Sequence, residues 1–103
     1  MRRGSLFITD DITMAMIPDT AIITIRPITD EGASIRAKAA MQEHRLYSLL
    51  DDPVLCEGLT DRLGVLIEPR NGKPLPQLQP GDELLIVRPD GLRFARVWAG
   101  VDL

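Results

Sequence analysis

Helix signals around Pro53 constrain the fold of this chain more than any other local feature. Pro53 fits the first position of a helix, where its missing N–H costs nothing, and an aspartate directly before it is a preferred N-cap. Gly64 fits the left-handed position that commonly ends a helix. Between these signals, leucines recur at helical spacing: Leu55, Leu59 and Leu63. The sequence therefore predicts a helix from Pro53 to Leu63 that is capped by Asp51 or Asp52.

A second helix is expected from about Asp30 to His44. Thr29 provides its cap, and acidic residues in the first turn and basic residues near the end suit the helix dipole. Its inner stripe is predicted to consist of Ile35, Ala39 and Met41. The many alanines of this segment indicate close packing of the helix against a sheet.

Strand-type segments surround these two helices. They are rich in β-branched and other apolar residues and are bounded by turn signals. We expect five such strands, at Leu6–Thr9, Thr20–Ile28, Val65–Glu68, Glu83–Pro89 and Leu92–Val101. Asp90–Gly91 is a two-residue hairpin signal, and Pro69–Asp82 is a loop because of its Pro and Gly content. This order predicts one α/β (α+β) domain over residues 1–103, with a mixed five-stranded sheet, two packed helices and a C-terminal β-hairpin.

Composition argues against several classes of protein. The chain has 103 residues, 45% of them apolar, which suffices for one hydrophobic core. Its net charge of −3 argues against a protein that holds duplex nucleic acid through phosphate contacts. Asp10 and Asp11 interrupt the apolar residues near the N-terminus, and no apolar run approaches the roughly 20 residues that span a bilayer. The single cysteine excludes an internal disulfide, so we expect a soluble cytoplasmic protein without membrane contact.

Candidate catalytic groups are few, and each also has a structural interpretation. Asp51 and Asp52 could form an acid–base pair, but capping explains both their type and their position. His44 could act as a general base, although a protonated imidazole at the end of a helix also suits the dipole. Cys56 lies inside the predicted helix from Pro53 to Leu63 and is more simply a buried thiol than a nucleophile. One Cys and one His cannot build a zinc site, so neither a metal nor a cofactor is expected.

Anion-binding side chains cluster in the loop segment "RNGK", which contains Arg70, Asn71 and Lys73. Guanidinium groups and backbone N–H groups of a flexible turn can hold a phosphate. The alternative interpretation of this segment is a solvated turn. Three further arginines flank the last hairpin: Arg88, Arg93 and Arg96.

Four motifs of the chain resemble those of one family. "SLFITDDIT" is similar to an opening strand that ends in Asn-Ser, and "IRPITDEGASIRAKAAM" to a helix entry of the form I-S-x-E-E-A. "LYSLLDDPVLCEGLTDRLGV" aligns without a gap with F-V-S-A-I-G-H-x-x-T-A-x-x-L-x-x-L-L-G-V, and "QPGDELLIVR" resembles x-P-G-D-x-x-L-V-F. These motifs are those of the viral ring nucleases, the type III anti-CRISPR proteins and their relatives. The resemblance covers most of residues 5–90.

The resemblance implies a homodimer with cyclic oligoadenylate bound across it. In the best-known members, a histidine at the start of the second helix cleaves cyclic tetra-adenylate without a metal. In this chain Asp52 stands at that position and Asp51 at the preceding glycine. An aspartate cannot donate a proton at neutral pH unless its pKa is strongly raised. The ligand-contacting Asn-Ser of the family corresponds to Thr9 and Asp10, which are therefore expected at the edge of the ligand.

The resemblance also places two arginines near the ligand. Arg70 is the counterpart of family arginines that follow the second helix. The family's late Arg-x-x-Glu-Gly loop is shortened here to "RPDG", where Arg88 and Asp90 are the stand-ins. The final strand, Leu92–Val101, resembles an added hairpin arm.

The residues support three hypotheses of function. The leading one is an anti-defence protein that sequesters a cyclic nucleotide second messenger in a homodimer, with Arg70, Asn71 and Lys73 on the phosphates. The second is an active ring nuclease in which His44 or Tyr47 is the acid. The third is an inhibitor of a host defence protein, whose final strand offers an edge for pairing and whose acidic face mimics nucleic acid. A viral protein of any of these kinds would act in the host cytoplasm.

Overall fold

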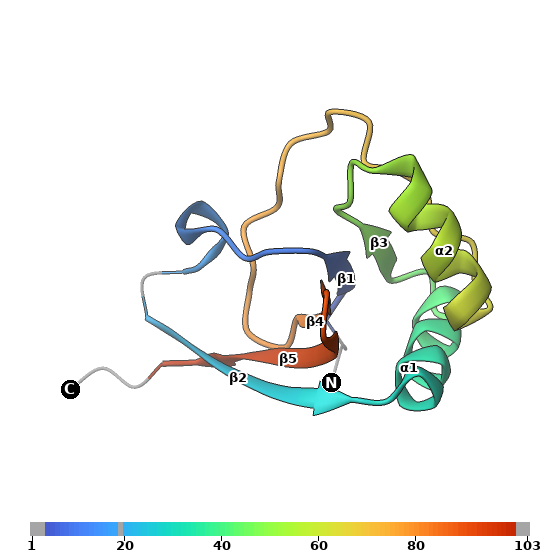
Figure 1. Ribbon diagram of the computed structural model, residues 1–103. Coiled ribbons are helices and arrows are strands. Elements are labelled where there is room, and N and C mark those ends of the chain that lie inside the picture. The colour runs from blue at the N-terminus through green and yellow to red at the C-terminus, as the bar shows by residue number, and fades with distance from the viewer. Residues whose placement is uncertain (1–3, 19, 101–103) are drawn as a thin grey trace.

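The computed structural model describes residues 4–18 and 20–100, and it has the α/β fold expected from the sequence. Its elements are β1 (Leu6–Thr9), the 3-10 helix η1 (Met14–Met16), β2 (Ala21–Ile28), α1 (Asp30–Gln42), β3 (Leu46–Ser48), α2 (Pro53–Leu63), β4 (Glu83–Arg88) and β5 (Gly91–Ala99). The five strands form one sheet in the order β2-β5-β4-β1-β3 (Figure 1). The sheet is mixed, because β1 runs parallel to β3 and β4 whereas β5 runs antiparallel to β2 and β4.

The C-terminal hairpin lies inside the sheet. β5 pairs with β4 on one side and with β2 on the other, so the outer edges among the described strands belong to β2 and β3. The expectation that the final strand is an added arm with a free edge is therefore wrong. The hairpin turn is also shifted by one residue: Gly91 pairs with Arg88, and Pro89 and Asp90 form the turn.

Both helices cover the same face of the sheet (Figure 1). The core on that face joins strand leucines and Phe94 to small and apolar helix residues, among them Leu6, Ile8, Ala33, Ala37, Ala40, Leu59, Leu63 and Leu85. The opposite face packs against Met16 of the short helix η1 and against the loop around Leu78. The sheet is thus covered by α1 and α2 on one side and by η1 and loops on the other.

The capping signals at both helices are confirmed. Thr29 caps α1 with its side-chain oxygen. The carboxylate of Asp52 accepts hydrogen bonds from the backbone N–H groups of Val54, at 3.0 Å, and Leu55, at 3.4 Å. Gly64 ends α2 with a φ of 71°, in the left-handed region that glycine adopts without a Cβ penalty. The second of the two adjacent aspartates is therefore the cap of α2.

We expect the substitution Asp52→Ala to lower the free energy of unfolding by about 1 kcal/mol, because two N–H groups of α2 lose their acceptor. Urea denaturation followed by circular dichroism measures this change. Asp52→Asn keeps an acceptor oxygen and should stay within about 0.5 kcal/mol of the unchanged protein. An alanine variant as stable as the unchanged protein would contradict the capping role.

The segment Val65–Glu68 is not a strand, contrary to the prediction. Its alternation is real, since Val65 and Ile67 are buried whereas Leu66 is 62% exposed. However, the N–H of Ile67 donates to the hydroxyl of Thr60 on α2 at 3.0 Å, so the segment packs on that helix. The fifth place in the sheet is taken by β3, which pairs with β1.

Helix α1 turns a different face to the sheet than predicted. Ile35 and Met41 are 64% and 48% exposed, and Ala39 is half-buried. The buried stripe consists of alanines instead: Ala33, Ala37 and Ala40. Small side chains let the helix axis lie close to the sheet, which a stripe with isoleucine would prevent. The helix also ends at Gln42 rather than at His44.

Candidate functional site

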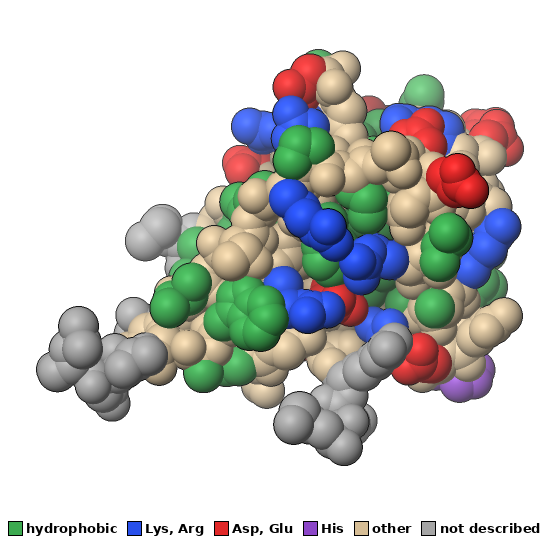
Figure 2. Space-filling model, turned by 90° about the horizontal axis from the view of Figure 1, so that it is seen from below, with side chains coloured by type: hydrophobic (Ala, Val, Ile, Leu, Met, Phe, Trp, Pro, Cys, Tyr) green, Lys and Arg blue, Asp and Glu red, His purple; other side chains and the backbone are tan. Residues whose placement is uncertain are grey.

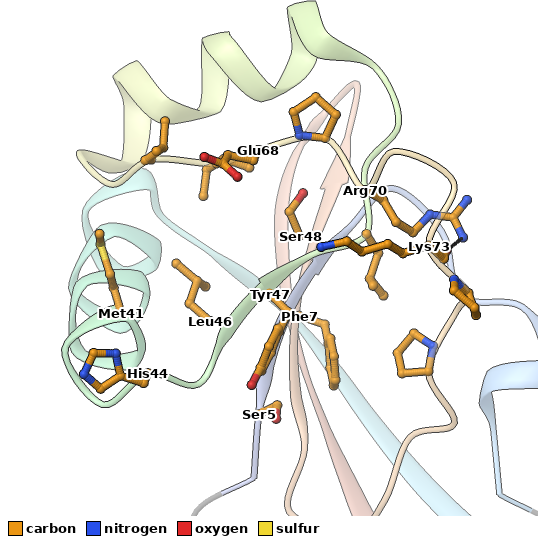
Figure 3. Close-up of a pocket in the computed structure, with 16 residues that line it drawn as sticks. Ser5, Phe7, Met41, His44, Leu46, Tyr47, Ser48, Glu68, Arg70 and Lys73 are labelled. Carbon is orange, nitrogen blue, oxygen red and sulfur yellow. Dashed lines mark hydrogen bonds between the residues drawn. The ribbon is translucent and has the colours of Figure 1, made fainter.

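A cavity of about 720 Å³ lies between β3 and the chain that follows α2 (Figure 3). This volume falls in the range of small-molecule sites, about 300–1,000 Å³. Its polar lining residues come from the start of β1, the turn after α1, β3 and the loop after α2: Ser5, His44, Tyr47, Ser48, Glu68, Arg70 and Lys73. The remaining lining is apolar, as is usual for a ligand site.

Four residues singled out in the sequence line this cavity. His44 lies in the turn after α1 and Tyr47 on β3, whereas Arg70 and Lys73 lie in the loop after α2 (Figure 3). Asn71 belongs to the same loop but does not line the cavity. The fold thus brings together two pairs of residues that the sequence places far apart.

Tyr47 forms the aromatic part of the cavity. It is 50% exposed, and its ring lies against the ring of Phe7, with centroids 5.7 Å apart and planes tilted by 31°. Parallel pairing of β1 with β3 sets Phe7 directly beside Tyr47. The supported ring offers a partly exposed surface on which a planar group can stack.

The loop after α2 is held by Arg70. Its guanidinium donates to the carboxylate of Asp51 at 2.7 Å through Nη2 and to the carbonyl of Lys73 at 2.8 Å through Nη1. The loop reverses at Asn71 and Gly72, which have φ angles of 57° and 76°. The Nε of Arg70 is buried and has no hydrogen-bond partner among residues 4–18 and 20–100. This donor is enclosed by protein atoms, so it is an unsatisfied group of the fold and not a contact that a ligand can reach.

The charges of Arg70 and Asp51 offset each other. Their hydrogen bond holds the pKa of the Asp51 carboxyl below its usual range and raises the pKa of Arg70. Both groups are therefore charged at neutral pH. Lys73 forms no ion pair with any residue that the structure describes, and Figure 3 shows its side chain extending from the loop toward β3. Lys73 thus supplies positive charge that no described carboxylate neutralises.

Acid should weaken the fold in part through Asp51. Because the folded-state pKa is depressed, the contribution of Asp51 to stability is fully present above its unfolded value of about 3.9 and is lost as the pH falls through the folded-state pKa. We expect the difference in unfolding free energy between the unchanged protein and Asp51→Asn to shrink from neutral pH toward about pH 2.5. Urea titrations at several pH values measure it.

The matched control for this titration is Glu57→Gln, which makes the same charge change on the exposed side of α2. Within the described chain, Glu57 has no ion pair. A difference between Asp51→Asn and the unchanged protein that stays constant with pH would contradict the link to the Arg70 ion pair.

Other predicted site residues lie away from this cavity. Thr9 ends β1 and is 3% exposed; its hydroxyl donates to the carbonyl of Asp11 at 2.6 Å and accepts from its N–H at 3.3 Å. Asp10 is exposed beside it. Arg88 lines a separate cavity of about 600 Å³, together with Asp11. The structure therefore does not gather Thr9, Asp10 and Arg88 with Arg70.

Four polar or aromatic lining residues were missed in the sequence: Ser5, Phe7, Ser48 and Glu68. Phe7 and Ser48 belong to the cavity because β3 pairs with β1, and this pairing leaves no local signal in the sequence. Glu68 lies in the segment that was mistaken for a strand. Its carboxylate adds a negative charge to the cavity, which favours ligands that also present donor groups.

Cys56 is a buried thiol, as predicted. It is 1% exposed, and burial is the main cause that raises its pKa, so it stays protonated at neutral pH. Within the described residues, no three His, Cys, Asp or Glu side chains lie close enough together to hold a metal ion. In the same part of the chain, no helix combines the length and apolar character needed to cross a bilayer.

Comparison with known proteins identifies the fold. No family model and no curated protein matches the sequence. Ten chains of solved structures are similar to it, among them B116 of Sulfolobus turreted icosahedral virus. The likeness to B116 has a TM-score of 0.74 at 15% sequence identity, over 92% of this chain and 99% of that one. At this identity the match shows the fold alone: the chain shares its fold with this viral protein.

Proposed function

We propose that this protein captures a small nucleotide, of the cyclic oligoadenylate kind, in the cavity beside β3 and sequesters it within a homodimer. The observation that carries the proposal is the meeting of Tyr47, Arg70 and Lys73 in one cavity of about 720 Å³. An exposed aromatic ring can recognise a base, and the ammonium group of Lys73, which no described carboxylate neutralises, can recognise its phosphate. The fold shared with a viral protein supports a role in overcoming host defence.

The three side chains have distinct roles in this proposal. The ammonium group of Lys73 binds phosphate oxygens as a point charge. Arg70 keeps the loop that carries Lys73 in place, through the hydrogen bonds of its Nη atoms to Asp51 and to the Lys73 carbonyl. Tyr47 stacks on a base, and its ring is already supported by Phe7, so little ordering is needed on binding.

Capture without cleavage fits the two aspartates at the start of α2. Asp51 is ionised through its bond to Arg70 and has no proton to give. Asp52 uses its carboxylate to cap α2. A phosphodiester cleaved without a metal needs a group that protonates the leaving oxygen. The second candidate function, an active ring nuclease, rests on His44 and Tyr47, which line the same cavity and can exchange protons.

The experiment that tests the proposal mixes the pure protein with a panel of cyclic nucleotides, from dinucleotides to cyclic hexa-adenylate. We expect a rise in melting temperature with at least one of them, and recovery of that nucleotide intact after the sample is heated and chromatographed. Linear products that disappear in His44→Ala, with binding retained, would establish the nuclease instead. No rise with any nucleotide would end both proposals and leave the inhibitor of a host defence protein.

The homodimer is tested in the same samples. Analytical ultracentrifugation of the free and nucleotide-bound protein is expected to show a dimer in both. Binding at a ratio of one nucleotide to two chains would agree with a ligand shared across the dimer. A monomer that binds one nucleotide per chain would agree with the proposed capture of a nucleotide, but it would contradict a binding site that is shared across a dimer.

A further inference from the structure

A further hollow, of about 920 Å³, lies on the face of the molecule shown in Figure 2, between α1, the end of β5 and the chain leading into β4. Figure 2 shows Lys and Arg side chains gathered around it, beside a large hydrophobic side chain. We call this surface the arginine–tryptophan face; it consists of Arg26, Arg36, Arg45, Arg96 and Trp98. It shares no lining residue with the cavity beside β3.

Positive charge on the arginine–tryptophan face exceeds negative charge. The carboxylate of Glu83 lies 2.7 Å from Arg96, 3.4 Å from Arg45 and 3.8 Å from Arg36. Glu43 supplies a second carboxylate, 3.1 Å from Arg45. These are the carboxylates that pair with the arginines of this face among the described residues. Three guanidinium groups thus share two carboxylates, and Arg26 pairs with neither, on a chain whose net charge is −3.

The excess charge is concentrated near Phe94. Arg36 and Arg26 lie over the same Phe94 ring, 4.0 Å and 5.3 Å from its centroid. Arg26 is exposed and has no ion pair with a described residue. Two like charges held beside one ring repel each other. A carboxylate that binds between them is therefore attracted more strongly than a carboxylate at a single arginine.

Trp98 is an exposed and fixed anchor point. It is 45% exposed, and its indole N–H donates to the hydroxyl of Thr24 at 3.0 Å, while Arg96 lies 5.3 Å from the ring centroid. Exposed aliphatic side chains flank it: Ile22, directly across from Trp98 on β2, is 51% exposed, and Ile35 on α1 is 64% exposed. Tryptophan, arginine and neighbouring apolar surface are the composition of protein-binding hot spots.

We infer that the arginine–tryptophan face docks an acidic, extended segment of a partner protein. Its carboxylates pair with Arg26 and Arg36, and an apolar side chain between them packs on Trp98 and Ile22. β2 is an outer strand of the described sheet, so the segment can add to it as a further strand. The exposed isoleucines favour a polypeptide over nucleic acid, because nucleic acid has no aliphatic side chains to cover them.

The experiment selects binders to the full-length protein from a displayed library of random peptides. The tryptophan at position 98 is the single one in the chain, so its emission reports binding of each synthetic peptide directly. We expect the selected peptides to carry acidic residues around an apolar residue and to shift the emission of Trp98. Arg26→Glu should weaken their binding about 10-fold or more, because it replaces attraction by repulsion.

Lys38→Glu is the matched control, with the same charge change on α1 but beside Gly64 at the end of α2. It should leave peptide binding unchanged. Selection without acidic enrichment, or equal weakening by Arg26→Glu and Lys38→Glu, would overturn the inference. A shift of the Trp98 emission with oligodeoxythymidylate but not with acidic peptides would also overturn the inference. A shift that depends on protein concentration alone would overturn it too, because it would indicate that a second copy of this chain occupies the face. Nucleotide binding beside β3 is measured separately, so either proposal can fail alone.

Discussion

Replacing Glu83 with glutamine is expected to lower the free energy of unfolding by about 3 kcal/mol, because it removes the one carboxylate that three arginines share. Glu83 is 8% exposed at the start of β4. Arg45 has a side chain that is 11% exposed, so its Nη1 loses the Glu83 carboxylate with little access to water, although its Nε keeps the pair with Glu43. The side chains of Arg36 and Arg96 are 36% and 40% exposed, so water screens their charges. The loss of unfolding free energy therefore stays at the lower end of the range of about 3–5 kcal/mol for breaking a buried ion pair.

The melting temperature of Glu83→Gln should accordingly fall by about 15 °C for a domain of this size. Asp90→Asn is the matched control: it removes a carboxylate from the exposed pair with Arg93 and should cost less than about 1 kcal/mol. If repulsion among the arginines is the cause, adding Arg45→Met to Glu83→Gln should restore part of the lost stability, which a double-mutant cycle measures. Equal costs for Glu83→Gln and Asp90→Asn would show that the cluster contributes no more than a surface pair.

Features that act within one turn of chain could be predicted from the sequence. Thr29, Asp52 and Gly64 begin or end helices through hydrogen bonds and backbone angles that involve their immediate neighbours. Such signals do not depend on what the rest of the chain does. The helices, the long strands and the mixed sheet followed from them and from the apolar patterns.

Features that depend on distant partners could not be predicted. β3 has three residues, and it is a strand because β1 pairs with it. Val65 and Ile67 alternate with an exposed residue as a strand would, yet their segment packs on α2. Alternation reveals which side chains are buried, but it leaves open which backbone groups pair with one another. The buried face of α1 was missed for a related reason, because close approach to the sheet favoured alanine over Ile35.

The candidate site shows the same difference between local features, which could be predicted, and features that depend on distant partners, which could not. The charges of Arg70 and Lys73 pointed to an anion site through residue type alone, whereas Tyr47 was considered only as an acid. That they share a cavity follows from the position of β3 beside the loop after α2, which is tertiary. Thr9 and Arg88 entered through resemblance to a family, and here they lie outside the cavity.

Lys73→Glu is expected to weaken binding of a cyclic oligoadenylate by about 100-fold, because a hydrogen-bonded charge is worth about 1.5–3 kcal/mol and each 1.4 kcal/mol is tenfold. Lys73 is the cavity cation that no described carboxylate neutralises, whereas Arg70 is already paired with Asp51. Isothermal titration with cyclic tetra-adenylate, or with the nucleotide that gives the largest melting shift, measures the loss. The melting temperature of the free protein should change little, since the Lys73 side chain is not part of the core.

The comparison between Lys73→Glu and Lys38→Glu decides where the phosphate binds. Both variants change the net charge equally, so a loss confined to Lys73→Glu assigns the phosphate to the cavity beside β3. Equal losses would mean that the ligand responds to the overall charge of the chain and has no fixed site at this loop. A Tyr47→Leu variant then distinguishes binding of the base from binding of the phosphate, because it removes the stacking ring while the charges of Arg70 and Lys73 remain. Weaker binding of a nucleotide in Tyr47→Leu, with unchanged binding of pyrophosphate, would place the base against β3 and the phosphate against the loop.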